Sequence, residues 1–129
     1  MLDWIKPGQT GGVFYPGGFS TSVNLLAAKY ASQPLASGTG TFTLSGGNLP
    51  AAINDNLMVS ARNKATVSGT NDVTLTLNPG TRGFSGKFLD PVTDKKTSFG
   101  GVIYEKPAPA AGYGLFLGTD QCGSVEITQ

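Results

Sequence analysis

The segment Val73-Thr74-Leu75-Thr76-Leu77 decides the fold class, because its apolar and polar residues alternate one by one. Successive side chains of a strand point to opposite faces, so this pattern gives one apolar face and one wet face. The same alternation recurs in Gly40-Thr41-Phe42-Thr43-Leu44-Ser45 and in Ser124-Val125-Glu126-Ile127-Thr128. These segments are therefore predicted to be half-buried strands.

A hairpin is predicted next to this first strand. The segment Gly83-Phe84-Ser85-Gly86-Lys87-Phe88 alternates aromatic with small or charged residues and leads into Asp90-Pro91-Val92-Thr93-Asp94-Lys95. Pro at the second position of that block suits a type I turn. The return strand is expected from Thr97 to Glu105, with a bulge or sharp bend at Gly100-Gly101.

Weaker patterns predict the remaining strands. They are expected at Ser20–Ala28, Leu57–Ala61, Ala65–Ser68 and Tyr113–Leu117, with a short opening strand at Trp4. The stretch Ser22 to Tyr30 also fits a turn or two of helix, and strand is the preferred interpretation. The segment Gly47 to Asn56 is interpreted as a loop carrying one helical turn.

Composition agrees with an all-β fold. Gly accounts for 19 of 129 residues, Ser and Thr are frequent, and charged residues make up only 13%. Gly serves tight turns, and Thr suits a pleated, half-wet surface. We therefore predict a single all-β domain over residues 1–129, a compact antiparallel barrel or sandwich of about eight to ten short strands.

Charge and hydropathy limit the partners. The net charge is +1 and the basic residues are scattered. The sequence therefore shows no basic patch that could bind a phosphate backbone, and nucleic acid is not an expected partner. No apolar run approaches the roughly 20 residues of a membrane span. Residues 1–7 lack the basic and apolar regions of a signal peptide. We expect a piece of a larger exported protein, extracellular or at the cell surface, whose signal lies upstream.

The residue types present argue against catalysis. The chain has no histidine, which removes the usual general base and the commonest zinc ligand. Carboxylates remain, but Asp90 and Asp94 fit a turn and Glu126 fits a wet strand face. Asn54-Asp55-Asn56 could offer oxygen ligands to calcium, yet these are also ordinary turn residues. No catalytic residue, metal site or cofactor is therefore predicted.

Cys122 is the only cysteine, so the chain cannot form an internal disulfide. A reactive thiol needs a basic neighbour or a helix N-terminus to lower its pKa, and the sequence shows neither. Cys122 is therefore interpreted as a small side chain at a turn before the last strand.

Aromatic residues give the one positive hint of a binding function. Carbohydrate-binding modules stack sugars on exposed Trp and Tyr rings. The candidate ligand-binding residues are Trp4, Tyr15, Tyr30, Tyr104 and Tyr113. The competing interpretation is that a chain with few large aliphatic residues needs these rings for its core.

Several blocks carry a resemblance that covers essentially the whole chain. They are Trp4-Ile5-Lys6-Pro7, Phe14-Tyr15-Pro16-Gly17-Gly18-Phe19, Ser45-Gly46-Gly47-Asn48-Leu49, Gly83 to Phe88 and Gly114-Leu115-Phe116-Leu117-Gly118-Thr119. The chain resembles C-terminal β modules of large secreted multidomain proteins of Verrucomicrobia-like bacteria. The resemblance implies upstream domains as partners, brings no catalytic residue, and has Ser where this chain has Cys122.

The sequence thus predicts a non-catalytic terminal β module of a secreted or cell-surface protein, with a structural, attachment or sorting role. One alternative is a carbohydrate-binding module that contacts a polysaccharide. Another is a subunit of an extracellular filament or virion surface, whose chain ends pair with neighbours by strand addition.

Overall fold

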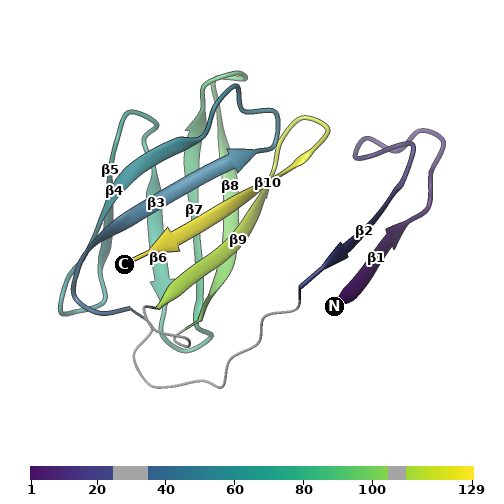
Figure 1. Ribbon diagram of the computed structural model, residues 1–129. Helices are drawn as coiled ribbons and strands as arrows, with labels where there is room; N and C mark the ends of the chain where they lie inside the picture. The colour runs from purple at the N-terminus through teal and green to yellow at the C-terminus, as the bar shows by residue number, and fades with distance from the viewer. Residues whose placement is uncertain (25–34, 105–109) are drawn as a thin grey trace.

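A computed structural model describes residues 1–24, 35–104 and 110–129, and all its regular elements are strands (Figure 1). A small sheet holds β1 and β2, and a large sheet holds the others. The strands are β1 (Leu2–Lys6), β2 (Phe19–Val23), β3 (Gly38–Gly46), β4 (Ile53–Val59), β5 (Ala65–Ser68), β6 (Thr74–Asn78), β7 (Gly83–Asp90), β8 (Lys95–Tyr104), β9 (Ala111–Leu117) and β10 (Cys122–Thr128). The predicted all-β fold is confirmed.

The large sheet curls into a nearly closed antiparallel barrel. Its eight strands run in the order β5-β4-β3-β10-β9-β8-β7-β6, and the edge strands β5 and β6 contact each other. The last strand, β10, lies between β3 and β9 (Figure 1). The C-terminal strand is therefore paired on both sides within the chain.

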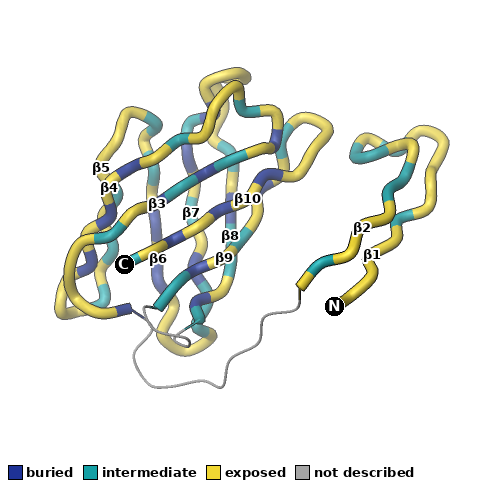
Figure 2. The backbone as a smooth tube through the Cα atoms, viewed as in Figure 1, coloured by how far each residue is buried: buried dark blue, intermediate teal, exposed yellow. Residues whose placement is uncertain are grey.

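The barrel encloses one apolar core. Buried residues alternate with exposed ones along the barrel strands (Figure 2), as expected when one face is wet. Phe42, Phe88 and Phe116 are among the largest fully buried side chains. The predicted alternations in β3, β6 and β10 are confirmed, with Leu75 and Leu77 buried and Thr74 and Thr76 exposed.

Glycines make room for the core phenylalanines. Gly86 pairs with Phe99, Gly101 with Phe84, and Gly123 with Phe116. A Cβ at Gly101 would overlap the Phe84 ring and the backbone of β9. The predicted bulge at Gly100-Gly101 is wrong, because β8 pairs continuously with both neighbours there. Gly101 is needed for close packing.

The prediction of a loop over Gly47 to Asn56 is wrong in its second half. β4 begins at Ile53, and Asp55 points into the barrel. Because the inward-facing residue Asp55 is polar, the sequence of β4 lacks the alternation of apolar and polar residues that indicates a strand. The predicted turn after β7 is confirmed: the buried Asp90 carboxylate accepts N–H bonds from Val92 and Thr93 at 2.8 and 3.3 Å.

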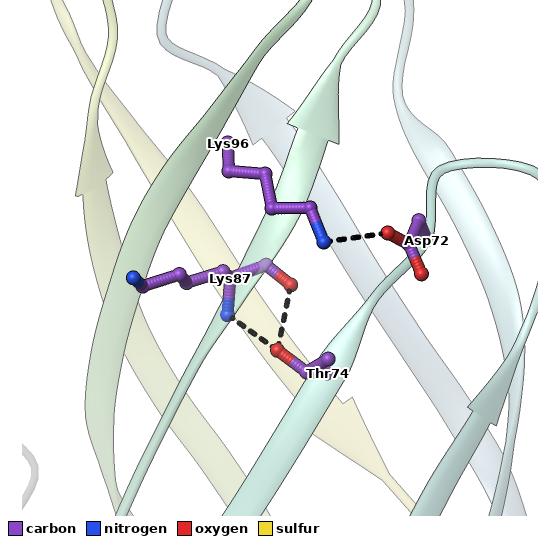
Figure 3. Close-up of polar contacts among 4 residues, drawn as sticks. All are labelled: Asp72, Thr74, Lys87 and Lys96. Atoms are coloured by element: carbon purple, nitrogen blue, oxygen red, sulfur yellow. Dashed lines mark hydrogen bonds and ion pairs between the residues drawn. The ribbon is translucent and has the colours of Figure 1, made fainter.

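Side-chain hydrogen bonds hold the edge strand β6 on β7 (Figure 3). The Thr74 hydroxyl donates to the Lys87 carbonyl at 3.3 Å and accepts from the Lys87 N–H at 3.2 Å. Nearby, the Lys96 ammonium on β8 lies 2.8 Å from an Asp72 carboxylate oxygen. These contacts connect β6 and the residues just before it to β7 and β8, next to the line where the edge strands β5 and β6 meet, here called the barrel seam.

The hairpin of β1 and β2, here called the ribbon, lies beside the barrel (Figure 1). Its strands pair without interruption from Leu2 opposite Val23 to Lys6 opposite Phe19. None of residues 1–24 is buried (Figure 2). The predicted strand Ser20–Ala28 is confirmed up to Val23, where β2 ends before Asn24, and residues 25–28 lie outside the described part of the chain. No helix in the described ranges is long and apolar enough to cross a membrane.

Candidate functional site

An apolar cleft of about 670 Å³ lies between the ribbon and one end of the barrel. Its volume falls in the range of small-molecule and peptide sites. The ribbon and its loop supply most of the lining, and the barrel supplies the ends of β9 and β10. The lining residues are Trp4, Ile5, Lys6, Pro7, Phe14, Tyr15, Phe19, Thr21, Val23, Leu117 and Cys122.

The pleat of the ribbon turns one apolar face toward the cleft. Trp4 pairs with Thr21 and Lys6 with Phe19, so these side chains share a face. The Phe19 ring lies at the centre of this face. Its centroid is 5.9 Å from that of the Trp4 ring, with an angle of 66° between the ring planes, and 5.2 Å from that of the Tyr15 ring, with an angle of 69°. Such edge-to-face packing fixes the rings as a small cluster.

A hydrogen bond joins the loop of the ribbon to the barrel. The Cys122 N–H donates to the Tyr15 hydroxyl oxygen over 3.3 Å. The barrel end that it reaches is itself fastened, because Asn48 donates to Asp120 at 2.6 Å and accepts the Asp120 N–H at 3.2 Å. These two bonds join the β3–β4 turn to the β9–β10 turn, two residues before Cys122.

The cleft remains open between its two apolar walls. Trp4 is 57% exposed on the ribbon, and Leu117 is 52% exposed on the barrel. Among the described lining residues only Lys6 is charged, and its ammonium donates to the Tyr15 carbonyl at 3.2 Å. The site thus offers apolar contact area with one cation at its side.

The barrel wall of the cleft continues as an apolar strip on the outside of β9. Tyr113, Leu115 and Leu117 alternate outward along this strand and are each about half exposed. Tyr104 on β8 joins the strip, with its ring 6.0 Å from Tyr113 at 57°. On most other barrel strands the outward positions are Thr, Ser or Asn, so the strip stands apart from the rest of the surface.

The structure divides the predicted aromatic residues between two places. Trp4 and Tyr15 meet in the cleft, and Tyr104 and Tyr113 meet on the outer strip. Tyr30 lies outside the described residues. The ring planes within each contact are tilted by 57° or more, so these pairs form no coplanar row.

Sequence reasoning missed the contribution of Phe19, Leu117 and Cys122 to the cleft. One signal was present: Tyr113-Gly114-Leu115-Phe116-Leu117 has large apolar residues at both alternating sets of positions, unlike the Thr-rich strands. A strand with two apolar faces needs a second covering layer. Cys122 is the first residue of β10. It is exposed and lines the cleft.

The carboxylates named as catalytic alternatives are engaged locally. Asp90 caps its own turn, and Glu126 lies at an exposed position of β10, as the sequence predicts. Of two further carboxylates, Asp120 accepts a hydrogen bond from Asn48, and Glu105 lies outside the described residues. Asp55, proposed as a calcium ligand, lies on β4 rather than in a loop, and burial raises its pKa above the ordinary value. No group of three His, Cys, Asp or Glu residues gathers in the described part of the chain.

The fold and the site define a class: an all-β, barrel-like domain with a lateral ribbon and an apolar cleft between the two. No protein-family model, curated protein or solved structure matches the chain.

Proposed function

We propose that the chain is a non-catalytic terminal β module of a secreted or cell-surface protein, and that it attaches that protein through the cleft between ribbon and barrel. The observation that carries this proposal is the cleft itself. Its walls bring Trp4 and Leu117, each more than half exposed, to the two sides of one cleft. Apolar surface left open in this way is characteristic of interaction sites.

The chemistry of the lining favours an apolar partner. Two of its few polar groups are already engaged, since Lys6 donates to the Tyr15 carbonyl and Tyr15 accepts from Cys122. A sugar in this cleft would leave hydroxyl groups without partners, which costs free energy. Apolar side chains of a cell-envelope component would instead cover Trp4, Phe19 and Leu117.

Co-sedimentation tests this function. The resemblance to modules of Verrucomicrobia-like bacteria makes their isolated envelope fractions the probe. We expect the chain to sediment with the envelopes, and Leu117→Lys to abolish this because it places a charge on the apolar wall. Met58→Lys is the matched control, since Met58 is 61% exposed on β4, outside the lining. Equal sedimentation of both variants would refute attachment through the cleft.

The alternative of polysaccharide binding is favoured by the Tyr104–Tyr113 pair. Glu126 of β10 pairs with Tyr113 across the sheet, so a carboxylate lies beside the exposed ring on the same face. This combination of ring and hydrogen-bonding group is that of sugar sites. If polysaccharide is the partner, Tyr113→Ala removes retention on an insoluble polysaccharide column, whereas Leu117→Lys leaves it unchanged.

A further inference from the structure

The outer edge of β1 is an unprotected strand edge. Among the described residues β1 pairs only with β2, whereas the barrel brings its own edge strands β5 and β6 together. Its five residues run in unbroken register with β2, with no bulge and no proline inside the strand. Native proteins normally block such edges with bulges, prolines or charges.

The two charged residues of β1 do not block this edge. The Asp3 carboxylate accepts a 2.6 Å hydrogen bond from the Ser22 hydroxyl on β2. The Lys6 ammonium donates to the Tyr15 carbonyl in the ribbon's loop. Both charges are thus drawn toward the ribbon itself, and the apolar side chains of Trp4 and Ile5 remain 57% and 66% exposed.

We propose that this edge pairs with β1 of a second copy of the chain, which joins two ribbons into one four-stranded antiparallel sheet. Closed two-fold pairing is the commonest form of self-association, and the same patch then serves on both copies. A two-stranded ribbon alone is marginally stable, and additional strands with an apolar face stabilise it. The proposal goes beyond the attachment function: it uses the backbone edge of β1, whereas attachment also needs the barrel wall at Leu117, and Trp4 belongs to both surfaces.

The sequence of β1 complements itself in one register. A two-fold axis normal to the sheet must pass through a residue paired with its own copy. With Ile5 at that axis, Ile5 meets Ile5 of the second copy, and each Trp4 lies opposite a Lys6. An Ile pair at the centre covers the most exposed large apolar side chain of β1. Each Lys6 ammonium exchanges its bond to the Tyr15 carbonyl for a contact with the Trp4 indole of the second copy.

Other registers are less favourable. An axis at Asp3 places two carboxylates directly opposite each other, which is destabilising. An axis at Trp4 sets Asp3 against Ile5 and pairs no cation with an indole. Charge complementarity therefore selects the register centred on Ile5 and a second copy as the occupant of the edge.

Sedimentation equilibrium from micromolar to millimolar concentration tests the proposal, with Trp4 fluorescence as a second readout because it is the only tryptophan. We expect a reversible monomer–dimer equilibrium and a blue shift of Trp4 emission as the dimer forms. Ile5→Lys should weaken dimerisation at least about tenfold, since it puts two cations at the axis. Met58→Lys, on an exposed site of β4, should have no effect.

Two results would overturn the inference. One is a monomer at millimolar concentration with constant Trp4 emission. The other is a dimer that persists in Ile5→Lys but dissociates in Leu115→Lys, which would place the contact on the outer strip of β9. Leu117→Lys separates this proposal from the attachment function, because it should abolish envelope binding and leave the dimer intact.

Discussion

The N–H of Cys122 donates to the hydroxyl oxygen of Tyr15 over 3.3 Å and so connects residues 107 positions apart in the chain. Tyr15 belongs to the loop of the ribbon, and Cys122 opens the last strand of the barrel. The contact holds one wall of the cleft against the other. The Tyr15 backbone is itself unusual, with φ at 48°, a conformation that is uncommon outside glycine.

Tyr15→Phe removes the acceptor for the Cys122 N–H while it keeps the ring against Phe19. We expect the ribbon to loosen by about 1 kcal/mol, the usual net value of one hydrogen bond. Hydrogen exchange of the Cys122 amide N–H should become about fivefold faster, since this bond protects it, with the thermal midpoint of the barrel unchanged. Tyr113→Phe is the control, and an equal rise there would contradict the assignment.

Asp55→Asn should stabilise the chain at neutral pH. Asp55 is buried, one of its carboxylate oxygens has no hydrogen-bond partner among the described residues, and burial raises its pKa. A carboxyl with a raised folded pKa stabilises the fold fully below its unfolded pKa, and this contribution is lost as pH rises through the folded pKa. Urea unfolding at pH 7 should show a gain of about 1 kcal/mol for the variant.

The same variant should lose its advantage in acid, where Asp55 is protonated in both states of the wild-type chain. Asp94→Asn is the matched control, because Asp94 is exposed in the turn after β7. A stability gain for Asp55→Asn that is equal at pH 3 and pH 7 would contradict an ionisation effect.

Two adjacent glycines of β8 should respond oppositely to alanine. A Cβ at Gly101 would overlap the Phe84 ring and the β9 backbone, whereas a Cβ at Gly100 would meet only the Phe84 carbonyl oxygen at 3.6 Å. Gly101→Ala should therefore cost about 1–3 kcal/mol or more, the usual penalty of overpacking. Gly100→Ala should be neutral or slightly stabilising in denaturant unfolding. Similar values for both would restore the bulge interpretation.

Thr74→Val tests the hydrogen bonds at the barrel seam. The substitution keeps the shape but removes the hydroxyl that both donates to and accepts from the Lys87 backbone. We expect a loss of about 1 kcal/mol in unfolding free energy. Lys96→Met should change the melting temperature little, because the Lys96–Asp72 pair is 56% and 62% exposed and surface ion pairs contribute little. A larger effect of Lys96→Met would contradict this ranking.

Much of the fold could be predicted from local patterns. Strands with a polar outer face, such as β6 with its threonines, show alternation that depends only on neighbouring residues. The first half of β4 was not predicted, because one of its inward-facing residues is Asp55, and Asp in a sequence usually indicates a turn. The role of Gly101 depends on Phe84, its partner on another strand, so the sequence pattern could not indicate it.

The cleft was harder to predict than the fold. The aromatic candidates included Trp4 and Tyr15, but nothing local indicates that the barrel wall against them comes from Leu117 and Cys122. That placement depends on the pairing of β9 with β10 and on the Tyr15 contact. In the sequence, only the large apolar residues at both alternating sets of positions in β9 indicated that the outer face of this strand contacts another part of the protein.

Alkylation of Cys122 tests the central claim most directly, because this single thiol lines the cleft and is exposed. The chain is treated with N-ethylmaleimide while free and while bound to the envelope fractions of the proposed co-sedimentation test, and the modified fraction is measured by intact mass. If attachment uses the cleft, bound chains are modified at least about tenfold more slowly than free chains, as for a site covered by its partner. An unchanged rate on chains that sediment with the envelopes would show that they attach through another surface.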